Sequence, residues 1–355
     1  MKIKVLILFL LTIPLLSAQT TRKYSNEFLN IGVDATALGM GNTVVSSVSD
    51  VTAGYWNPAG LMALEDSQGA AMHASYFANI AQYDYIGFAM PLNDASAFGL
   101  SLIRFGVDDI LDTTQLIDSQ GNIDYNRINL FSAADYALTL SYARKPIIKN
   151  MYWGLNAKII HRRIGKFATS YGFGLDAGWQ YTKEDWHYGI MLRDITTTFN
   201  VWNINEEEFA KIQNAIPDEN QELPETTELT LPKAQIGVAK DWNITRDIQL
   251  QTALDLNIRF AQTNAIISSE FASIEPAFGF QADYLDMVFL RGGVNNLQTE
   301  TQFDESTSIS WQPNIGVGFK YNGIQVDYAL TNIASTGNAL YSNIFSIKID
   351  FGIFR

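Results

Sequence analysis

The sequence predicts an all-β fold: a transmembrane antiparallel β-barrel of about 14 strands with an N-terminal hatch, or plug, inside its lumen. Three observations lead to this prediction. A secretory leader opens the chain, long alternating segments fill it from about residue 69 onward, and short connections between these segments alternate with long ones. A soluble secreted all-β protein shares the leader and the alternation, so the strand lengths and the connections must decide between the two classes.

Residues 1–18 have the three-part layout of a signal peptide. Lys2 and Lys4 precede an apolar run over residues 5–11, and small residues lead to Ala18, after which we expect cleavage. The run is too short to cross a bilayer comfortably as a helix, and the chain has no cysteine that a lipid anchor could use. The sequence therefore predicts an exported, multi-pass protein of the bacterial outer membrane, in contact with outer-membrane lipids.

Composition and motifs exclude several classes of function. With 24 Lys and Arg against 37 Asp and Glu, the net charge of −13 argues against a nucleic-acid partner. The three histidines, His73, His161 and His187, are scattered, so we expect no metal site and no cofactor. The sequence contains no nucleophile elbow, zinc-protease motif or phosphate loop. We therefore expect no catalytic residues and no enzyme.

The alternating segments have the length of membrane-spanning strands. In the clearest one, residues 248–260, apolar residues occupy every second position and Gln, Asp, Asn and Arg stand between them. Residues 171–181 repeat the pattern with aromatic residues and glycine. Such segments reach about 10–13 residues, more than the five or six of globular strands and enough to cross the hydrocarbon core when tilted. Their polar face suits a filled or water-lined lumen.

The connections between segments support the same conclusion. Tight turns such as 92–95 and 322–323 alternate with longer stretches, which we predict to be extracellular loops at 107–132, 195–231, 261–273 and 296–312. Outer-membrane barrels have short periplasmic turns and long outer loops, and an even strand count places both chain ends in the periplasm. We assign the barrel to residues 67–355.

The last predicted strand ends almost at the C-terminus. Its outward positions carry apolar side chains, and the machinery that inserts barrels reads such terminal strands. The residues assigned to this strand are Phe345, Ile347, Ile349, Phe351, Ile353 and Phe354.

Residues 19–66 lack sustained alternation and are rich in glycine and small residues, which permit close packing and tight turns. We assign them to the hatch. Within it, Asn57 can close a turn on backbone amides while Pro58 fixes φ. The motif either holds the hatch in place or contacts a ligand. Its residues are Gly39, Met40, Gly41, Trp56, Asn57, Pro58, Ala59, Gly60 and Leu61.

These motif residues, within 32–42 and 50–61, resemble the hatch of the FadL-like outer-membrane protein superfamily, and its PorV/PorQ-like branch from Bacteroidota in particular. The resemblance covers the hatch through its motifs and the barrel only through its pattern. It implies a 14-stranded barrel with an N-terminal plug, in agreement with the count from alternation.

The stretch 195–231 is the most unusual of the predicted loops because it is long and acidic. It can be a solvated loop, a docking surface for a partner, or a weak site for a divalent cation. The residues that we single out as a candidate docking loop are Trp202, Glu206, Glu207, Glu208 and Phe209.

Two functions follow from the resemblance and the loop. In the first, the chain is a non-enzymatic subunit or adaptor of a larger outer-membrane complex, either type IX secretion-like or accessory to outer-membrane protein assembly. Its protein partners are then the translocon, secreted cargo or the barrel-assembly machinery. In the second, it is a FadL-like channel for hydrophobic small molecules such as fatty acids. Polar inward positions such as Gln251 and Asp255 favour the first.

Overall fold

The computed structural model describes residues 25–354 apart from 77–78, 118–119, 216–225, 302–305 and 333–340. Fourteen antiparallel strands form a closed β-barrel, in which β1 pairs with β17 to complete the ring. This confirms the predicted fold class. The signal peptide assigned to residues 1–18 lies outside the described residues. Among the described residues, no helix is long and apolar enough to cross a membrane.

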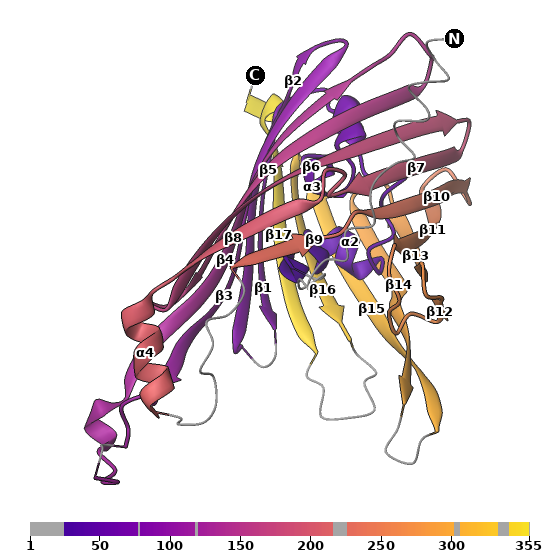
Figure 1. The fold of residues 1–355 in the computed structure, drawn as a ribbon. Helices are drawn as coiled ribbons and strands as arrows, with labels where there is room; N and C mark the ends of the chain where they lie inside the picture. Colours follow the sequence, from indigo (N-terminus) through magenta and orange to yellow (C-terminus); the bar gives the residue numbers. More distant parts are fainter. Residues whose placement is uncertain are drawn as a thin grey trace, which may run out of the picture.

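The strands of the ring are connected in chain order, and most are longer than those of globular sheets (Figure 1). They are β1 (Gln68–Tyr76), β2 (Ala81–Asn93), β3 (Ser96–Asp112), β4 (Asn129–Arg144), β5 (Met151–Ile164), β6 (Ala168–Lys183), β7 (Trp186–Arg193), β10 (Lys233–Asn243), β11 (Ile248–Arg259), β13 (Ser273–Tyr284), β14 (Val288–Thr301), β15 (Thr307–Tyr321), β16 (Ile324–Thr331) and β17 (Ser342–Asp350).

Three short strands extend this ring: β8 (Thr198–Ile204), β9 (Thr227–Thr230) and β12 (Ile267–Ser268). β7 pairs with β6 only from Ala177 onward, and β8 takes the earlier residues of β6. β9 then pairs with β8. The wall beyond the end of β7 is therefore continued by a second hairpin, whose two strands are joined through α4 (Glu206–Ala215).

The two ends of the barrel differ in their connections. The end that carries the C-terminus, at the top of Figure 1 and here called the inner end, has two-residue turns such as Glu184–Asp185 between β6 and β7. The opposite end, here called the outer end, carries most of the long connections. The alternation is not complete, because the β5–β6 turn at the outer end comprises only residues 165–167.

All four predicted loops contain more strand than expected, since β8 and β9 lie within 195–231 and β12 lies within 261–273. β3 continues to Asp112 and β4 begins at Asn129, while β14 and β15 extend into the 296–312 stretch. Adjacent strands satisfy their backbone hydrogen bonds with each other whatever their side chains are, so loss of alternation does not end them. Asp109, with φ of 57°, belongs to a bulge where the β3–β4 pairing shifts register and then resumes at Ile110.

Side chains alternate between the two faces of the wall as predicted. On β11, Leu254 is 43% exposed on the outer surface and the adjacent Asp255 is fully buried on the lumenal side. Exposed aliphatic and aromatic residues recur in this way around the ring, which is the surface that a hydrocarbon environment requires.

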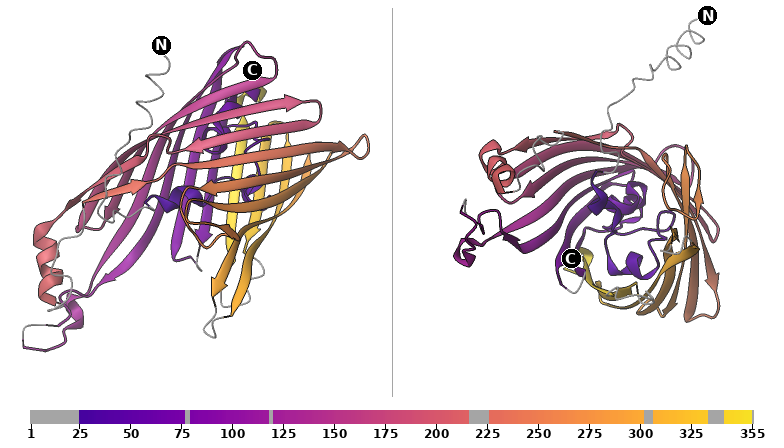
Figure 2. Two further views of the ribbon diagram at one scale, coloured as in Figure 1. Left: turned by 45° about the vertical axis from the view of Figure 1, so that its right-hand side comes forward. Right: turned by 60° about the horizontal axis from the view of Figure 1, so that its bottom comes forward.

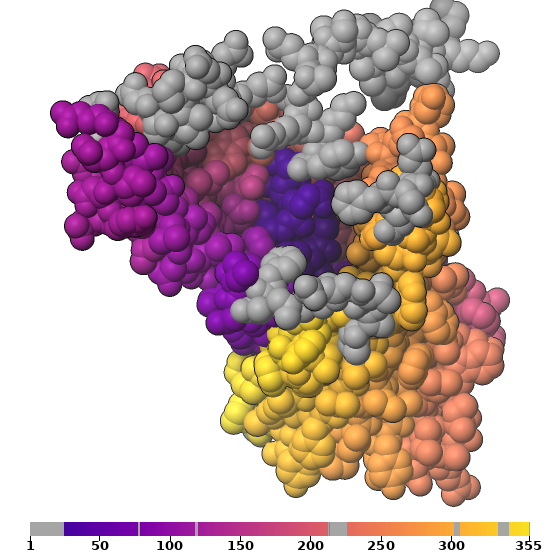
Figure 3. Space-filling model, turned by 90° about the horizontal axis from the view of Figure 1, so that it is seen from below, coloured from indigo at the N-terminus to yellow at the C-terminus, as the bar shows by residue number. Residues whose placement is uncertain are grey.

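Residues 25–66, here called the N-terminal segment, lie inside the barrel. They form η1 (Glu27–Asn30), α2 (Ala35–Gly39), α3 (Ala53–Trp56) and η2 (Pro58–Ala63). The right-hand view of Figure 2 shows this indigo segment surrounded by strands, and Figure 3 shows it at the bottom of the opening at the outer end. α2 packs against β14–β17 and η2 against β3–β6, so the segment touches opposite sides of the wall.

The prediction for the end of the last strand is wrong. Phe345, Ile347 and Ile349 lie on β17, but the strand ends at Asp350, and the stretch Phe351–Phe354 forms the short helix η4. The backbone N–H of Gly352 donates a 2.9 Å hydrogen bond to the Asp350 carboxylate, which turns the chain away from the strand direction. Phe351, Ile353 and Phe354 are therefore not strand residues.

Candidate functional site

Asn57 joins the N-terminal segment to the barrel wall. Its amide nitrogen donates hydrogen bonds to the carbonyl oxygens of Val45, 2.9 Å away, and of Trp179 on β6, 3.0 Å away. Its side-chain oxygen accepts a 3.3 Å bond from the backbone N–H of Ala59, which closes the local turn. Pro58 then starts η2, where a missing N–H is harmless. Because Asn57 is completely buried, these bonds hold the segment against β6.

Glycines of the wall leave room for the backbone of this segment. A β-carbon at Gly154 on β5 would lie 2.5 Å from the carbonyl carbon of Pro58, which is closer than real β-carbons approach other atoms. On the segment itself, Gly41 adopts φ of 65° and lies against the backbone of Val294 on β14. Glycines of the wall and of the segment therefore allow close backbone contact at both positions.

Lys348 on β17 ties the N-terminal segment to the closing strand. Its Nζ atom lies 2.9 Å from Oδ2 of Asp34 and 2.9 Å from Oδ2 of Asp50. Burial raises the pKa of Asp34, and the charge of Lys348 offsets only part of this effect. Burial acts in the same direction on Asp50, but Lys348 and hydrogen bonds from Thr52 outweigh it and lower the pKa of Asp50. The charged form of Asp50 is therefore the better stabilised of the two carboxylates.

Several other buried charges of the lumen are paired within the wall. Lys158 lies 2.8 Å from Asp176 and 2.6 Å from Asp194, and Arg291 lies 2.7 Å from Asp327. Removing one member of such a pair leaves an uncompensated buried charge, so these pairs fix the inner surface of the barrel. Among the described residues, no group of three or more His, Asp or Glu is placed to hold a metal ion.

The N-terminal segment lies between two cavities that share no lining residue. The cavity at the outer end, here called the outer vestibule, has a volume of about 470 Å³ and is bordered by η1, α3 and the outer ends of the strands. The cavity at the inner end has a volume of about 380 Å³ and is lined by residues such as Asp34, Asp50 and Lys348. Both linings are rich in amide and charged side chains.

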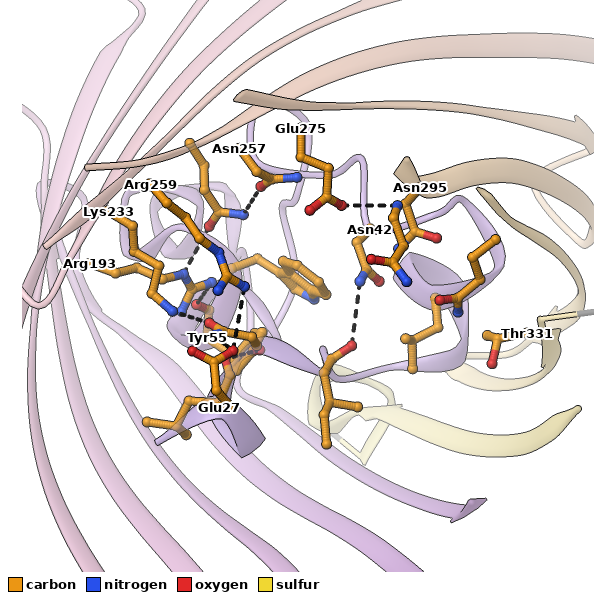
Figure 4. A pocket seen from close by; sticks show the side chains of 18 of the residues that line it. Glu27, Asn42, Tyr55, Arg193, Lys233, Asn257, Arg259, Glu275, Asn295 and Thr331 are labelled. Carbon is orange, nitrogen blue, oxygen red and sulfur yellow. Dashed lines mark hydrogen bonds and ion pairs between the residues drawn. The ribbon is translucent and has the colours of Figure 1, made fainter. Parts of the chain in front are cut away.

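The outer vestibule gathers side chains from distant parts of the chain (Figure 4). Arg193 stacks on the ring of Tyr55, with its guanidinium carbon 4.7 Å from the ring centre, and donates a 3.0 Å hydrogen bond to the Tyr55 carbonyl oxygen. Arg259 lies 3.4 Å from Glu27 of η1. Trp56, from the predicted hatch motif, also lines this cavity, whereas Asn57 lines neither cavity.

Two of the five predicted docking residues contact other parts of the same chain. The Glu208 carboxylate of α4 lies 2.9 Å from Lys166 in the β5–β6 turn and 2.6 Å from Lys211. Hydrogen bonds from these two lysines lower the pKa of Glu208. The guanidinium carbon of Arg162 lies 5.1 Å from the centre of the Trp202 ring. Trp202 and Glu208 thus hold β8 and α4 to the barrel.

The remaining docking candidates divide into two groups. Glu206 and Glu207 are solvent-exposed, while Phe209 is half-buried. Asn205 caps the helix, since its side-chain oxygen accepts a 3.1 Å hydrogen bond from the backbone N–H of Glu207. Only the two exposed glutamates of the five candidates therefore present their side chains fully to solvent.

An exposed apolar surface, which the sequence analysis did not single out, lies at the far end of the β3–β4 hairpin. We call it the outer tip. β3 spans 17 residues, whereas a tilted strand crosses the hydrocarbon core in about 9–11. Leu102 of β3 pairs with Leu138 of β4. Leu111 lies about 30 Å further along β3 and pairs with Leu130 of β4. The residues of the outer tip are Leu111, Ile117, Ile123, Tyr125 and Leu130, which are 57–72% exposed.

The sequence contained only an indirect signal for these features. The outer tip falls within the predicted loop 107–132, which contains ten large apolar residues, an unusual number for a solvated loop. The vestibule residues Arg193, Lys233 and Arg259 stand at the ends of predicted strands, but the register that brings them together depends on pairings that the sequence does not specify.

The closed 14-stranded ring, its apolar outer surface and its occupied lumen define an outer-membrane barrel of FadL-like fold. Solved structures of this fold include a Pseudomonas aeruginosa FadL homologue, with a TM-score of 0.52 and 11% identity over 90% of this chain and 98% of that one. The Ralstonia pickettii toluene transporter TbuX has a TM-score of 0.54 and 11% identity, over 90% and 98% of the two chains. The Pseudomonas putida toluene transporter TodX has a TM-score of 0.54 and 11% identity, over 90% and 99%.

At such low identity these likenesses establish the fold alone. Residues 17–256 match the family described as "Type IX secretion system protein PorV". The match covers more than half of the chain, so the chain belongs to this family and is a type IX secretion outer-membrane protein. No curated protein matches the chain.

Proposed function

We propose that this barrel is a subunit of a type IX secretion complex that docks a protein partner through the outer tip. The observation that carries the proposal is the position of the tip. From the lengths of β3 and β4, 17 and 16 residues, we infer that its five exposed apolar side chains lie beyond the part of these strands that crosses the hydrocarbon core, which takes about 9–11 residues. Burying an aliphatic or aromatic side chain yields about 1.5–3 kcal/mol, so a partner protein has much to gain there.

The geometry of the tip supports a protein surface rather than a random loop. Ile117 and Ile123 form an isolated β-bridge, and Leu111 and Leu130 are direct cross-strand partners. Tyr125 lies in the short helix η3 (Tyr125–Arg127), which is capped by a hydrogen bond from the backbone N–H of Asn126 to Asp124. The apolar side chains are therefore held on an ordered scaffold, and an exposed ordered apolar patch is typical of interaction sites.

The N-terminal segment supports an adaptor role over a channel role. We infer that it acts as a plug, since it contacts opposite walls and is fixed by Asn57 and Lys348. A channel for hydrophobic molecules needs a continuous apolar path, whereas amide and charged side chains interrupt the apolar lining of the two cavities beside the segment. We also propose that the protein is exported by a cleaved signal peptide. The outer end of the barrel then faces the cell surface.

As the protein partner we propose a secretion translocon or its cargo rather than the barrel-assembly machinery. The family to which the chain belongs favours this choice. Site-specific photo-cross-linking tests it in intact cells. A photoreactive amino acid placed at Tyr125 should give covalent adducts with secretion proteins, identified by mass spectrometry.

The matched control places the same amino acid at Phe271, which is 82% exposed in the connection between β11 and β13 at the outer end. This position should give few adducts. Equal adduct patterns at the two positions, or adducts only with barrel-assembly proteins at Tyr125, contradict the proposal.

A further inference from the structure

Three cationic side chains stand in one row across the lumenal wall of the outer vestibule. Lys233 at the start of β10 is the direct cross-strand partner of Arg193 at the end of β7 and of Arg259 at the end of β11. All three side chains line the same cavity, and Figure 4 shows them grouped on one of its sides. Like charges directly opposite each other in a sheet destabilise it. A row of three cations therefore destabilises the sheet locally, in a chain whose net charge is −13.

The protein itself compensates only part of this positive charge. Glu27 pairs with Arg259 at 3.4 Å, and both side chains are partly exposed. Within the described residues, Lys233 and Arg193 form no ion pair. Lys233 donates to the side-chain oxygen of Asn30, and Arg193 donates a 2.8 Å hydrogen bond to Gln235.

The other acids near this row are engaged elsewhere. Asp194 follows Arg193 in sequence, but its carboxylate pairs with Lys158 at 2.6 Å and accepts a 2.6 Å hydrogen bond from Thr198. Glu275, across the vestibule, accepts a 2.9 Å hydrogen bond from the backbone N–H of Asn296. Lys233 and Arg193 therefore keep their positive charges, and within the described residues their hydrogen bonds go to neutral oxygens.

We propose that the outer vestibule binds a carboxylate group carried by a polypeptide, at Lys233 and Arg193 with help from Arg259. Lysine and arginine donate charge-assisted hydrogen bonds to carboxylates, and these are about twice as strong as neutral ones. A carboxylate here would relieve the repulsion along the row and replace the neutral partners of the two cations.

The rest of the lining fits a peptide better than a lipid. Amide side chains at Asn42, Asn257, Asn295 and Gln312 can each donate to and accept from a peptide backbone. A volume of about 470 Å³ is in the range of sites for ligands of a few residues.

This inference rests on the proposed function, because a secretion subunit meets exported polypeptides, but it is tested separately. The probe is a hexapeptide of alternating serine and glycine with a free C-terminal carboxylate and an N-terminal fluorescent label that is neutral and has no carboxylate, added to the purified full-length mature chain in detergent. A second probe has an amidated C-terminus, and a third is amidated but contains two aspartates. Fluorescence anisotropy measures binding of each.

The free-acid peptide, the aspartate peptide or both should bind, and the neutral amidated peptide should not. Binding of the free-acid peptide indicates recognition of a terminal carboxylate, and binding of the aspartate peptide indicates recognition of a side-chain carboxylate. The substitutions Lys233→Gln and Arg259→Gln should each weaken binding at least about fivefold, the loss expected when a hydrogen bond to a charged group is removed. Lys320→Gln, which changes a lysine at the inner end that pairs with Asp286, should leave affinity unchanged.

Folding of each variant is checked by its shift on a gel after heating. Lys233→Gln removes one charge from a repulsive row, so this variant should fold as well as the wild type. Equal binding of the neutral amidated peptide, or equal affinity of the Lys233→Gln and Lys320→Gln variants for the carboxylate peptides, overturns the inference. Cross-linking at Tyr125 would still stand in that case, so the proposed function is judged on its own.

Discussion

The ammonium group of Lys348 lies 2.9 Å from the carboxylate of Asp34, which joins the strand that closes the barrel to the start of α2 inside it. The two residues are 314 positions apart in the chain. Ser346, two residues earlier on β17, donates a 2.7 Å hydrogen bond to the other oxygen of Asp34 and accepts one from the backbone of Ala35. Closure of the ring and placement of the N-terminal segment are therefore coupled through one strand.

Replacing Lys348 with methionine should strongly destabilise the folded barrel. The substitution leaves Asp34 buried without its cation, and breaking a buried pair in this way costs about 3–5 kcal/mol. The measurement is the midpoint of urea unfolding in detergent or lipid. The matched change Lys320→Met removes an exposed partner of Asp286 and should cost no more than about 1 kcal/mol. Equal midpoints for both variants would show that the buried pair has no structural role.

Replacing Asn57 with alanine should loosen the N-terminal segment. The carbonyl oxygens of Val45 and Trp179 each lose a hydrogen bond, while Val45 keeps the one from Gln180, and each lost bond costs about 0.5–1.5 kcal/mol. The expected results are a lower urea midpoint and faster proteolysis between residues 25 and 66. Asn129→Ala, which removes an exposed bond to the Arg127 carbonyl, serves as control. Protection as strong as in the wild type would assign Asn57 a role other than anchoring.

Attachment of α4 to the barrel should depend on pH through Glu208. Hydrogen bonds from Lys211 and Lys166 lower the pKa of this carboxyl in the folded state. A lowered pKa means that the interaction stabilises the fold above the unfolded value, which is about 4.3 for glutamate, and that this contribution disappears as the pH falls through the folded value. Hydrogen exchange of residues 206–215 should therefore accelerate, beyond the intrinsic effect of pH, on going from pH 7 to pH 3.

The variant Glu208→Gln should lose this pH dependence, while Glu207→Gln, at an exposed position without a lysine partner in the described structure, should keep it. Identical pH profiles for the two variants would mean that α4 is held by other contacts.

Serine at Leu111 and Tyr125 together should reduce partner association without harming the barrel. Both side chains are more than 60% exposed, so their removal costs little folding free energy, whereas each loses about 1.5–3 kcal/mol of burial in a complex. The readout is the amount of partner recovered with a tagged copy, relative to Ile267→Ser in the short strand β12. Unchanged recovery would place the docking surface away from the outer tip.

The class of fold was predictable because alternation is a local property. Residues 248–260 show which side chains face lipid and which face the lumen without any knowledge of their neighbours, and the structure places Leu254 outside and Asp255 inside accordingly. The end of β17 was not predictable in this way, because a single hydrogen bond from Gly352 to Asp350 turns a strand-like sequence into η4.

The site depends on pairings between distant residues, which alternation does not specify. Lys233 lies between Arg193 and Arg259 only in one register, and a slip of one residue would turn it to the lipid face. The Asn-Pro turn of the hatch motif could be proposed from its own residues, whereas its bond to Trp179 could not, since the two residues are 122 positions apart.

Isolation of the protein from its own outer membrane tests the central claim most directly. A tagged copy is solubilised in mild detergents and its partners are identified by mass spectrometry after size separation. We expect a complex larger than one mature chain that contains other secretion proteins and is depleted by serine at Leu111 and Tyr125. A monomer free of partners in every detergent, with secretion intact in the serine variant, would contradict it.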